Sequence, residues 1–323
     1  MSNRVHRSPI DPRQRAVDNS PKPLAPEGAP VSADPGASTI QLAQSLRGRV
    51  SVTSVLRGGV QEDDLVAVEE PLEIRLAGEP VAVLMRTPGD DHRLALGFLF
   101  TEGVLSSAAD VAAVFHCGRP GAEGYGNAID VAPASGARIA WDRLDGAQRS
   151  FAATSACGVC GRKTIEDLLE GLQPPAKGPA LPASTIVEAV EALRGHQPAF
   201  AATGGTHVAA LWARDGALVA AHEDVGRHNA VDKVVGALLV ARAAARDGGS
   251  APPEPGLLAV SSRAGIEVVQ KAARASVPVV ASVSAPTSLA VALARSAGLG
   301  LCGFVRRGRM NVYAGAHRID FER

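Results

Sequence analysis

The first half of the chain alternates apolar and polar residues over short runs. Three such runs, V-S-V-T-S-V-L, L-E-I-R-L-A-G and V-A-V-L-M-R-T, occupy residues 50–56, 72–78 and 81–87. A period of two places successive side chains on opposite faces, so each run predicts a strand. Gly78 to Pro80 supplies a turn between the second and third runs, which are therefore expected to form a hairpin.

A helix is predicted after Asp90 and Asp91, which are suited to cap its amino end. Its apolar residues share one face, and the pattern ends near Gly103. Four more short strands are then predicted, at residues 111–116, 127–131, 138–141 and 149–154.

Beyond residue 182 the pattern changes to longer helical stretches between strands. Thr185 and Glu188 have the spacing of a capping box, which predicts a helix running through Arg194. An Asp-Gly turn then separates apolar runs at residues 206–213 and 217–222, and this arrangement predicts two paired strands.

A long helix with a stripe of valine and leucine follows Asn229 and ends at the Gly248-Gly249 loop. From Leu257 the chain alternates strand, helix, strand, helix and strand. Such alternation predicts an α/β layer with parallel pairing, so we expect the α/β class for the second half of the chain.

Proline-rich stretches divide the chain into three parts. Residues 1–40 are rich in proline and poor in periodic apolar positions, which predicts a disordered tail. A second proline-rich stretch, Q-P-P-A-K-G-P-A-L-P, begins at residue 173 and is typical of an exposed connector. We therefore expect a smaller β-rich N-terminal domain over residues 41–173 and a C-terminal α/β domain over residues 174–323.

Composition narrows the class of protein. Lysine plus arginine equals aspartate plus glutamate at 33 each, so no overall charge attracts nucleic acid or an anionic membrane. Neither a membrane-spanning apolar run nor a signal-peptide pattern is present in the sequence. Four cysteines in 323 residues are too few for a disulfide framework. These features predict a cytoplasmic globular protein with thiols kept reduced.

The sequence S-A-C-G-V-C-G places Cys157 and Cys160 two residues apart between glycines. A helix is predicted to start after Thr164, so the dithiol precedes a helix amino end and lies close to Arg162 and Lys163. Both features favour a thiolate and lower a thiol pKa. Metal ligation, disulfide exchange and sulfur transfer through a persulfide are all compatible with such a pair.

Four polar loops interrupt the apolar second half near predicted strand ends, where open α/β sheets usually bind ligands. The loop T-G-G-T-H, residues 203–207, is suited to a plain turn or to an anion. H-E-D-V-G-R-H-N, residues 222–229, has more charged groups than a turn needs, which favours function. S-S-R-A-G at 261–265 and F-V-R-R-G-R at 304–309 are suited to phosphate, through hydroxyls and arginine, or to simple capping and an exposed basic turn.

These blocks together resemble the formate dehydrogenase accessory sulfurtransferase family, FdhD. The resemblance rests on S-A-C-G-V-C-G, E-D-V-G-R-H-N-A-V-D-K, S-S-R-A-G and L-C-G-F-V-R-R-G-R-M-N-V-Y in this order, and it covers roughly Val50 to Arg323. It implies a cytidine-deaminase-like α/β fold and a cytoplasmic homodimer. It also implies a sulfur carrier that takes sulfur from a cysteine desulfurase. The acceptor that the resemblance implies is the bis(molybdopterin guanine dinucleotide) molybdenum cofactor of formate dehydrogenase.

The resemblance also implies roles for individual residues. Cys157 corresponds to the persulfide cysteine and Cys160 to its partner. The segment assigned to the cofactor, with its guanine nucleotides, comprises Phe304, Val305, Arg306, Arg307, Gly308 and Arg309. From the polar loops we add Arg263, His222, Arg227 and His228 to the predicted cofactor site, and we expect no metal ion bound by the protein itself.

Two other functions remain open at this stage. A zinc-dependent, deaminase-like hydrolase would use Cys157 and Cys160 with His222 or His228 as ligands and Glu223 as general acid and base. That family's motif order, H-x-E before P-C-x-x-C, differs from the order here. A protein that only chaperones the molybdenum cofactor, with the two cysteines as a redox latch, is the non-catalytic alternative.

Overall fold

The computed structural model describes residues 39–122, 124–144, 172, 175, 178–246 and 248–322. Cys157 and Cys160 lie outside the described residues. So do residues 1–38 of the tail predicted for residues 1–40, the strand predicted at 149–154 and the start of the helix predicted after Thr164. Predictions for these segments stay predictions. Residues 39 and 40, assigned to the same tail, instead begin a helix.

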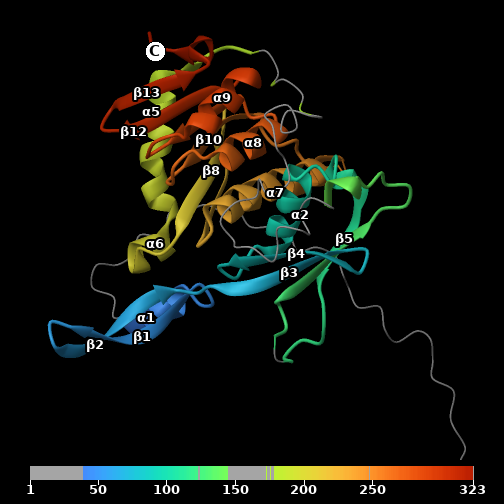
Figure 1. Cartoon of the computed structure of the whole chain (residues 1–323), viewed down its shortest axis with the longest axis vertical. Helices are drawn as coiled ribbons and strands as arrows, with labels where there is room; N and C mark the ends of the chain where they lie inside the picture. The colour runs from blue at the N-terminus through green and yellow to red at the C-terminus, as the bar shows by residue number, and fades with distance from the viewer. Residues whose placement is uncertain are drawn as a thin grey trace, which may run out of the picture.

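Within the described residues, a six-stranded sheet forms the centre of the second half of the chain (Figure 1). Its strand order is β13-β12-β11-β10-β8-β9. Three strands are parallel, as the alternation predicts: β10 (Pro255–Val260), β11 (Val279–Ser282) and β12 (Gly300–Arg306). The other three join the sheet antiparallel: β8 (His207–Ala213), β9 (Leu218–Asp224) and β13 (Arg309–Ala314). The predicted α/β class is confirmed.

Helices cover both faces of this sheet. One face packs against α7 (Arg227–Arg246), α8 (Ile266–Arg274) and α9 (Ser288–Ser296). The other packs against α5 (Ala183–Ala192) and η2 (Leu193–His196). Helix α6 (Pro198–Thr203) follows, and its Ala199 packs with Val50 and Leu65 instead. Because side chains alternate along a strand, the neighbours Leu257 and Leu258 of β10 enter different hydrophobic cores.

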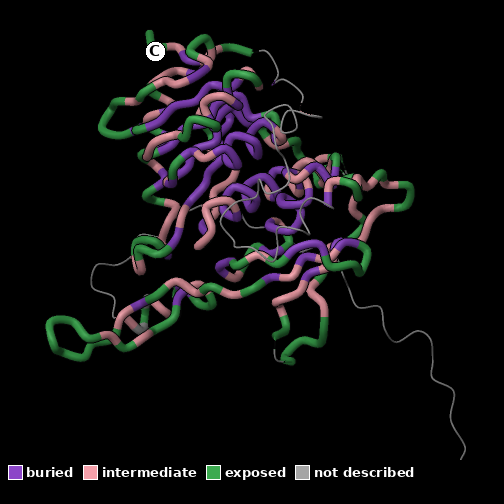
Figure 2. The backbone as a smooth tube through the Cα atoms, viewed as in Figure 1, coloured by how far each residue is buried: buried purple, intermediate pink, exposed green. Residues whose placement is uncertain are grey.

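The described N-terminal half contains a four-stranded sheet in the order β4-β3-β6-β5. Its strands are β3 (Glu70–Leu76), β4 (Glu79–Arg86), β5 (Val111–His116) and β6 (Ala128–Pro133). The predicted hairpin of β3 and β4 is confirmed. Before it, α1 (Thr39–Ser45) precedes β1 (Val50–Arg57) and β2 (Val60–Ala67), which pair as a projecting, largely exposed arm (Figures 1 and 2).

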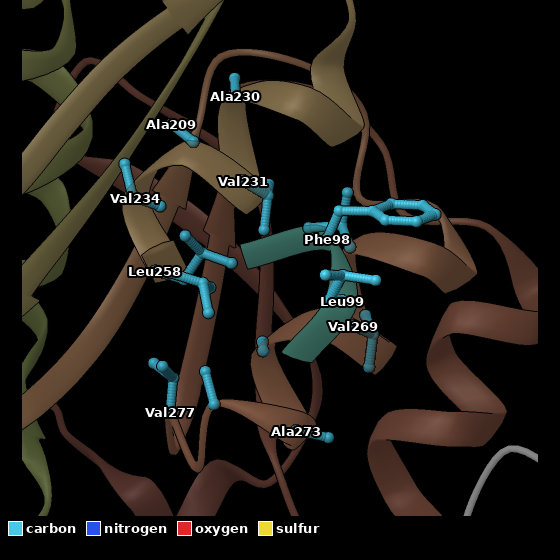
Figure 3. Packing of buried hydrophobic residues seen from close by; sticks show 14 of the residues in the cluster. Phe98, Leu99, Ala209, Ala230, Val231, Val234, Leu258, Val269, Ala273 and Val277 are labelled. Atoms are coloured by element: carbon cyan, nitrogen blue, oxygen red, sulfur yellow. The ribbon is translucent and has the colours of Figure 1, made fainter. Parts of the chain in front are cut away.

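Helix α2 (Asp91–Thr101) packs against elements of both halves of the described chain. It lies between the four-stranded sheet and α7, and its Phe98 and Leu99 pack near Val231 and Val269 (Figure 3). A Cβ atom added to Gly97 would lie 1.8 Å from the backbone oxygen of Asp232. One on Gly236 would lie 1.9 Å from that of Arg93. The two helices therefore cross backbone to backbone, and one core extends across the predicted domain boundary.

The remaining short elements complete the described chain. They are η1 (Ala108–Asp110), β7 (Leu181–Pro182), η3 (Ala316–Arg318) and β14 (Ile319–Asp320). Strands β7 and β14 pair in parallel beside the main sheet. None of the helices in the described ranges has the length and apolar character needed to cross a bilayer.

Three local predictions are wrong. No strand forms at residues 138–141, where the Ala140 N–H donates to the Val104 carbonyl at 3.1 Å instead of joining a ladder. Thr185 and Glu188 form no capping box, because α5 begins earlier, at Ala183, directly after Pro182. Asp90 precedes α2 but does not cap it by a side-chain hydrogen bond.

Candidate functional site

The acidic residues of the 222–229 loop are built into the fold. The buried Glu223 carboxylate accepts hydrogen bonds from the backbone N–H groups of Ala199 and Phe200, both at 2.9 Å, and from the Thr206 hydroxyl at 2.7 Å. Arg49 adds an ion pair at 3.2 Å. With both oxygens occupied, Glu223 fixes the start of α6 and is not available as the general base of a deaminase-like hydrolase.

Asp224 has a similar structural role. Its Oδ2 lies 2.8 Å from Lys233 Nζ and accepts from the Thr87 N–H at 3.2 Å. Its Oδ1 accepts from the Gly226 N–H at 2.8 Å and from the Asn229 side chain at 3.0 Å. This buried network ties the start of α7 to the end of β4. The two acids of the loop therefore serve the fold, whereas the residues predicted for the cofactor site are His222, Arg227 and His228.

His222 points toward α2. Its Nδ1 lies 3.1 Å from Asp90 Oδ2, and its Nε2 lies 3.4 Å from Arg93 Nη1. Burial acts to raise the pKa of Asp90, but the hydrogen bond with His222 and the charges of His222 and Arg93 outweigh it and hold that pKa below its usual value. His222 lines neither of the two cavities described next.

A cavity of about 1600 Å³ opens at the carboxyl ends of the parallel strands. Its walls are α5, η2 and α6 on one side and the β12–β13 hairpin on the other. Arg306, Arg307 and Arg309 of the hairpin line it together with Arg194 of η2. None of the four forms an ion pair with a residue that the structure describes. The cavity therefore concentrates positive charge in a chain whose formal net charge is zero.

The hairpin has an unusual backbone that presents these arginines. Phe304 has a φ of 53° and donates its N–H to the Ser284 carbonyl at 3.1 Å, and the pairing of β12 with β13 shifts register there. Arg307 and Gly308 form the turn, with φ values of 51° and 71°. The Arg306 guanidinium lies 5.9 Å from the centre of the Phe304 ring, and Val305 is buried as an anchor. The predicted loop 304–309 is thus mostly strand, with a two-residue turn.

A second, smaller cavity of about 260 Å³ opens on the surface. It is lined by Arg227 at the start of α7, by Arg263, Gly265 and Glu267 around the start of α8, and by Thr287 and Ser288 at the start of α9. The loop that follows β10 supplies Ser261 to the larger cavity and Arg263 to this one. The residues that the sequence predicts for a single converging site are therefore divided between two cavities.

His228 is adjacent to two lining residues of the smaller cavity, Arg227 in sequence and Glu267 in space. Its Nε2 is buried, has no hydrogen-bond partner among the described residues and lies 3.6 Å from Glu267 Oε2. Burial, followed by the charges of Arg227 and Lys271, lowers its pKa from 6.5 to about 3. The imidazole is therefore neutral at pH 7.

The lowered pKa of His228 predicts a stability effect. Between pH 3 and 6.5 the unfolded chain binds a proton that the folded chain does not, so the free energy of unfolding falls as pH falls below 6.5. Moving from pH 7 to about pH 5.5 should cost the wild type about 1 kcal/mol through this residue. In His228→Gln that contribution should vanish in urea denaturation at the two pH values. His317→Gln, at an exposed position, is the matched control, and an equal slope in both variants would contradict the assignment.

The structure brings together some predicted site residues and separates others. Phe304, Arg306, Arg307 and Arg309 share the larger cavity, Arg227 and Arg263 share the smaller one, and His222 stands apart. The polar and aromatic lining residues that sequence analysis missed include Glu191, Arg194, Phe200, Glu267 and Thr287. No motif marks these residues, because they come from helices that the sequence pattern does not align with the loops. The T-G-G-T-H loop is mainly a turn after α6, although its His207 lines the larger cavity.

The cysteines and potential metal-ligating side chains of the described ranges form no further candidate site. Cys302 is buried in the core between the six-stranded sheet and α5, and burial raises its pKa to about 12. Cys117 is half-buried. In these same ranges no group of three His, Cys, Asp or Glu side chains has the geometry to bind a metal ion.

Comparisons with known proteins place the chain in a family. The model of the FdhD/NarQ family matches residues 67–320. The chain is 55% identical over 283 residues to the sulfur carrier protein FdhD of Anaeromyxobacter dehalogenans strain 2CP-C, covering 87% of this chain and 98% of that one. It is 44% identical over 261 residues to the sulfur carrier protein FdhD of Streptomyces coelicolor, covering 79% and 89% of the two chains.

A solved structure is similar to this chain as well. It is described as a formate dehydrogenase accessory protein from Desulfotalea psychrophila, and it superposes with a TM-score of 0.62 at 28% identity. The similarity covers 84% of this chain and 98% of the other. Since the family model spans well over half of the chain and the relatives match along nearly their whole lengths, the chain belongs to the FdhD/NarQ family.

Proposed function

We propose that this protein is a sulfur carrier that serves formate dehydrogenase. It accepts sulfur from a cysteine desulfurase on Cys157 and delivers it to the bis(molybdopterin guanine dinucleotide) molybdenum cofactor. Family membership supports the sulfur-carrier role, because the matched relatives carry that name. The observation that carries the acceptor side of the proposal is the larger cavity, in which four arginines have no ion-pair partner among the described residues.

Loading follows from thiolate chemistry. The Cys157 thiolate attacks the outer sulfur of the donor's cysteine persulfide, a new S–S bond forms on Cys157, and the donor cysteine leaves as a thiolate. The positions of Arg162, Lys163 and the predicted helix start favour the thiolate form of Cys157. Cys160 is proposed to release or relay the sulfur.

Acceptor binding follows from charge and shape. The acceptor is a large anion with phosphate groups, and arginine binds phosphate bidentately and stacks on aromatic rings. Arg194, Arg306, Arg307 and Arg309 supply the charge, and the exposed rings of Phe200 and Phe304 supply flat apolar surface in the same cavity. Homodimerisation and the identity of the desulfurase stay predictions of the family resemblance.

One experiment tests the proposal against its alternatives. The full-length protein is incubated with a cysteine desulfurase and cysteine, and its intact mass is measured. We expect the added mass of sulfur, removable by a thiol reductant. A cofactor chaperone would bind the cofactor without ever gaining sulfane sulfur, so an unchanged mass would favour that alternative. The zinc-hydrolase alternative is disfavoured because Glu223 is saturated with hydrogen bonds.

Arg309→Ala should weaken the binding of GDP, used as a fragment of the cofactor. A charge-assisted hydrogen bond contributes on the order of 1.5 to 3 kcal/mol, so the dissociation constant should rise by roughly ten- to a hundredfold. Isothermal titration calorimetry measures the change, and sulfur loading should be unaffected.

Arg246→Ala is the matched control, since Arg246 is exposed at the opposite end of α7 from the cavities. Equal GDP affinity in Arg309→Ala and Arg246→Ala would remove Arg309 from the binding site. The hairpin would then be a solvated basic turn.

A further inference from the structure

Glu191 is an acidic side chain in a basic cavity. It lies in the last turn of α5 and is the one carboxylate among the described residues that line the larger cavity, beside four arginines. The dipole of a helix disfavours negative charge near its carboxyl end, so the stability of α5 does not explain a carboxylate here. Ion pairing does not explain it either, because Glu191 forms no ion pair with an arginine that the structure describes.

The Glu191 carboxylate instead contacts the tip of the β12–β13 hairpin. Its Oε1 accepts a hydrogen bond of 3.4 Å from the backbone N–H of Gly308, which lies 117 residues further along the chain. Arg307 and Gly308 form the turn of this hairpin, and the strand ladder pairs Arg306 with Arg309 on either side of it. The Gly308 N–H takes no part in that ladder, so it is available to an acceptor outside the two strands.

The turn that Glu191 contacts is unfavourable in two ways. Arg307 has a φ of 51°, in the left-handed region that favours glycine. Arg306 lies directly opposite Arg309, where like charges repel. Such a backbone persists only where its surroundings hold it, and residues of this kind gather at ligand sites. The Glu191 contact is part of those surroundings, because it ties the turn to α5 and brings a negative charge close to the arginines.

A phosphate group is suited to replace Glu191 at this turn. Phosphate oxygens accept hydrogen bonds from arginine and from the backbone N–H groups of turns at the same time. At 3.4 Å the bond to Glu191 is long for a charged acceptor, so a phosphate oxygen that comes closer makes the stronger bond.

We propose that Glu191 is a placeholder for a phosphate group: it holds the arginine turn until an anion enters the larger cavity, and then releases the Gly308 N–H to that anion. Glu191 is thus a positioning residue that lowers the affinity of the cavity for anions. Competition from an internal carboxylate suits a protein that must release its acceptor after sulfur transfer. The inference rests on the proposed function, because it takes the larger cavity to be the site of an anionic acceptor.

Calorimetry of the full-length protein with inorganic pyrophosphate tests the role of the charge. Glu191→Gln keeps a side-chain oxygen for Gly308 but removes the negative charge, so it should bind pyrophosphate about three- to tenfold more tightly than wild type at low salt, and the gain should shrink as salt is added. The binding event concerned is the one that Arg309→Ala weakens. Glu188→Gln is the matched control and should bind like wild type, because Glu188 is an exposed carboxylate of the same helix that does not line the cavity.

Amide hydrogen exchange at Gly308 tests the contact itself. Glu191→Ala removes the acceptor, so Gly308 should exchange faster in this variant than in wild type, whereas Glu191→Gln should stay close to wild type. Saturating pyrophosphate should slow the exchange of Gly308 in wild type and in Glu191→Ala alike, because a phosphate oxygen then serves as the acceptor. Urea denaturation of each variant confirms that the compared proteins are folded.

The outcomes separate this inference from the proposed function. If wild type binds pyrophosphate and a folded Glu191→Gln protein binds it no more tightly, the placeholder role is overturned and the anion site stands. Equal exchange of Gly308 in wild type and Glu191→Ala would overturn the placeholder role as well. Absence of pyrophosphate binding in wild type and in every variant would instead remove the anion site of the larger cavity, and the placeholder role with it.

Discussion

Cys157→Ser should abolish sulfur loading while leaving the fold intact. The serine hydroxyl cannot form the S–S bond on which a persulfide depends, and it is not ionised at neutral pH, whereas a thiolate near Arg162 and Lys163 is the reactive nucleophile. Incubation with a desulfurase and cysteine should therefore give no added sulfur in the intact mass, and formate dehydrogenase activity in a cell that depends on this protein should be lost. Loading at the wild-type level would rule out Cys157 as the carrier.

Cys160→Ser is the matched control for that change. It removes the neighbouring thiol from the same glycine-flanked segment, so it tests whether position or mere thiol content matters. Because Cys160 is proposed to relay or release sulfur, this variant should load in part and transfer poorly to the acceptor. A greater loss of loading in Cys160→Ser than in Cys157→Ser would reverse the two roles.

The fold could be predicted where burial imposes a period. The parallel strands β10 to β12 are continuous apolar runs covered on both faces, and the helices between them have apolar stripes, so pattern and structure agree. Strand β2 escaped prediction because V-Q-E-D-D-L-V-A belongs to a largely exposed arm, in which only Leu65 enters a hydrophobic cluster and imposes no period. The strand predicted at residues 138–141 is wrong because a hydrogen bond to Val104, and not a neighbouring strand, pairs with the backbone there.

The candidate site could be predicted only in part, for a different reason. The segment 304–309 is conspicuous because three arginines follow an apolar strand. The acids of E-D-V-G-R-H-N-A-V-D-K are equally conspicuous, yet Glu223, Asp224 and Asp232 are buried partners of backbone N–H groups and lysines. Charge in a sequence does not reveal whether its partner is a ligand or the fold. Arg194 and Glu267 were missed because only tertiary packing brings them to the cavities.

A buried ion pair joins α7 and α8 near the smaller cavity. Lys271 Nζ of α8 lies 2.8 Å from both carboxylate oxygens of Asp232 in α7 and donates to the Thr101 hydroxyl of α2 at 2.9 Å. Burial acts to lower the pKa of Lys271, but the charges of Asp232 and Glu102 outweigh it and raise that pKa, so the lysine is charged. Three helices meet at this pair, and two of them begin at the smaller cavity.

Lys271→Met should destabilise the protein by about 3–5 kcal/mol in urea denaturation at pH 7, because it leaves the Asp232 carboxylate buried without its counter-ion. The double variant with Asp232→Leu should recover most of that loss, since two apolar side chains of similar size can replace a buried pair at little cost. Arg242→Met, which breaks the exposed pair with Glu254 at 3.3 Å, is the control and should change the stability by less than about 1 kcal/mol. If Lys271→Met were no more destabilising than Arg242→Met, or if the double variant were worse than the single one, the helices would owe their arrangement to apolar packing alone. The junction of α2, α7 and α8 would then not depend on this charge pair.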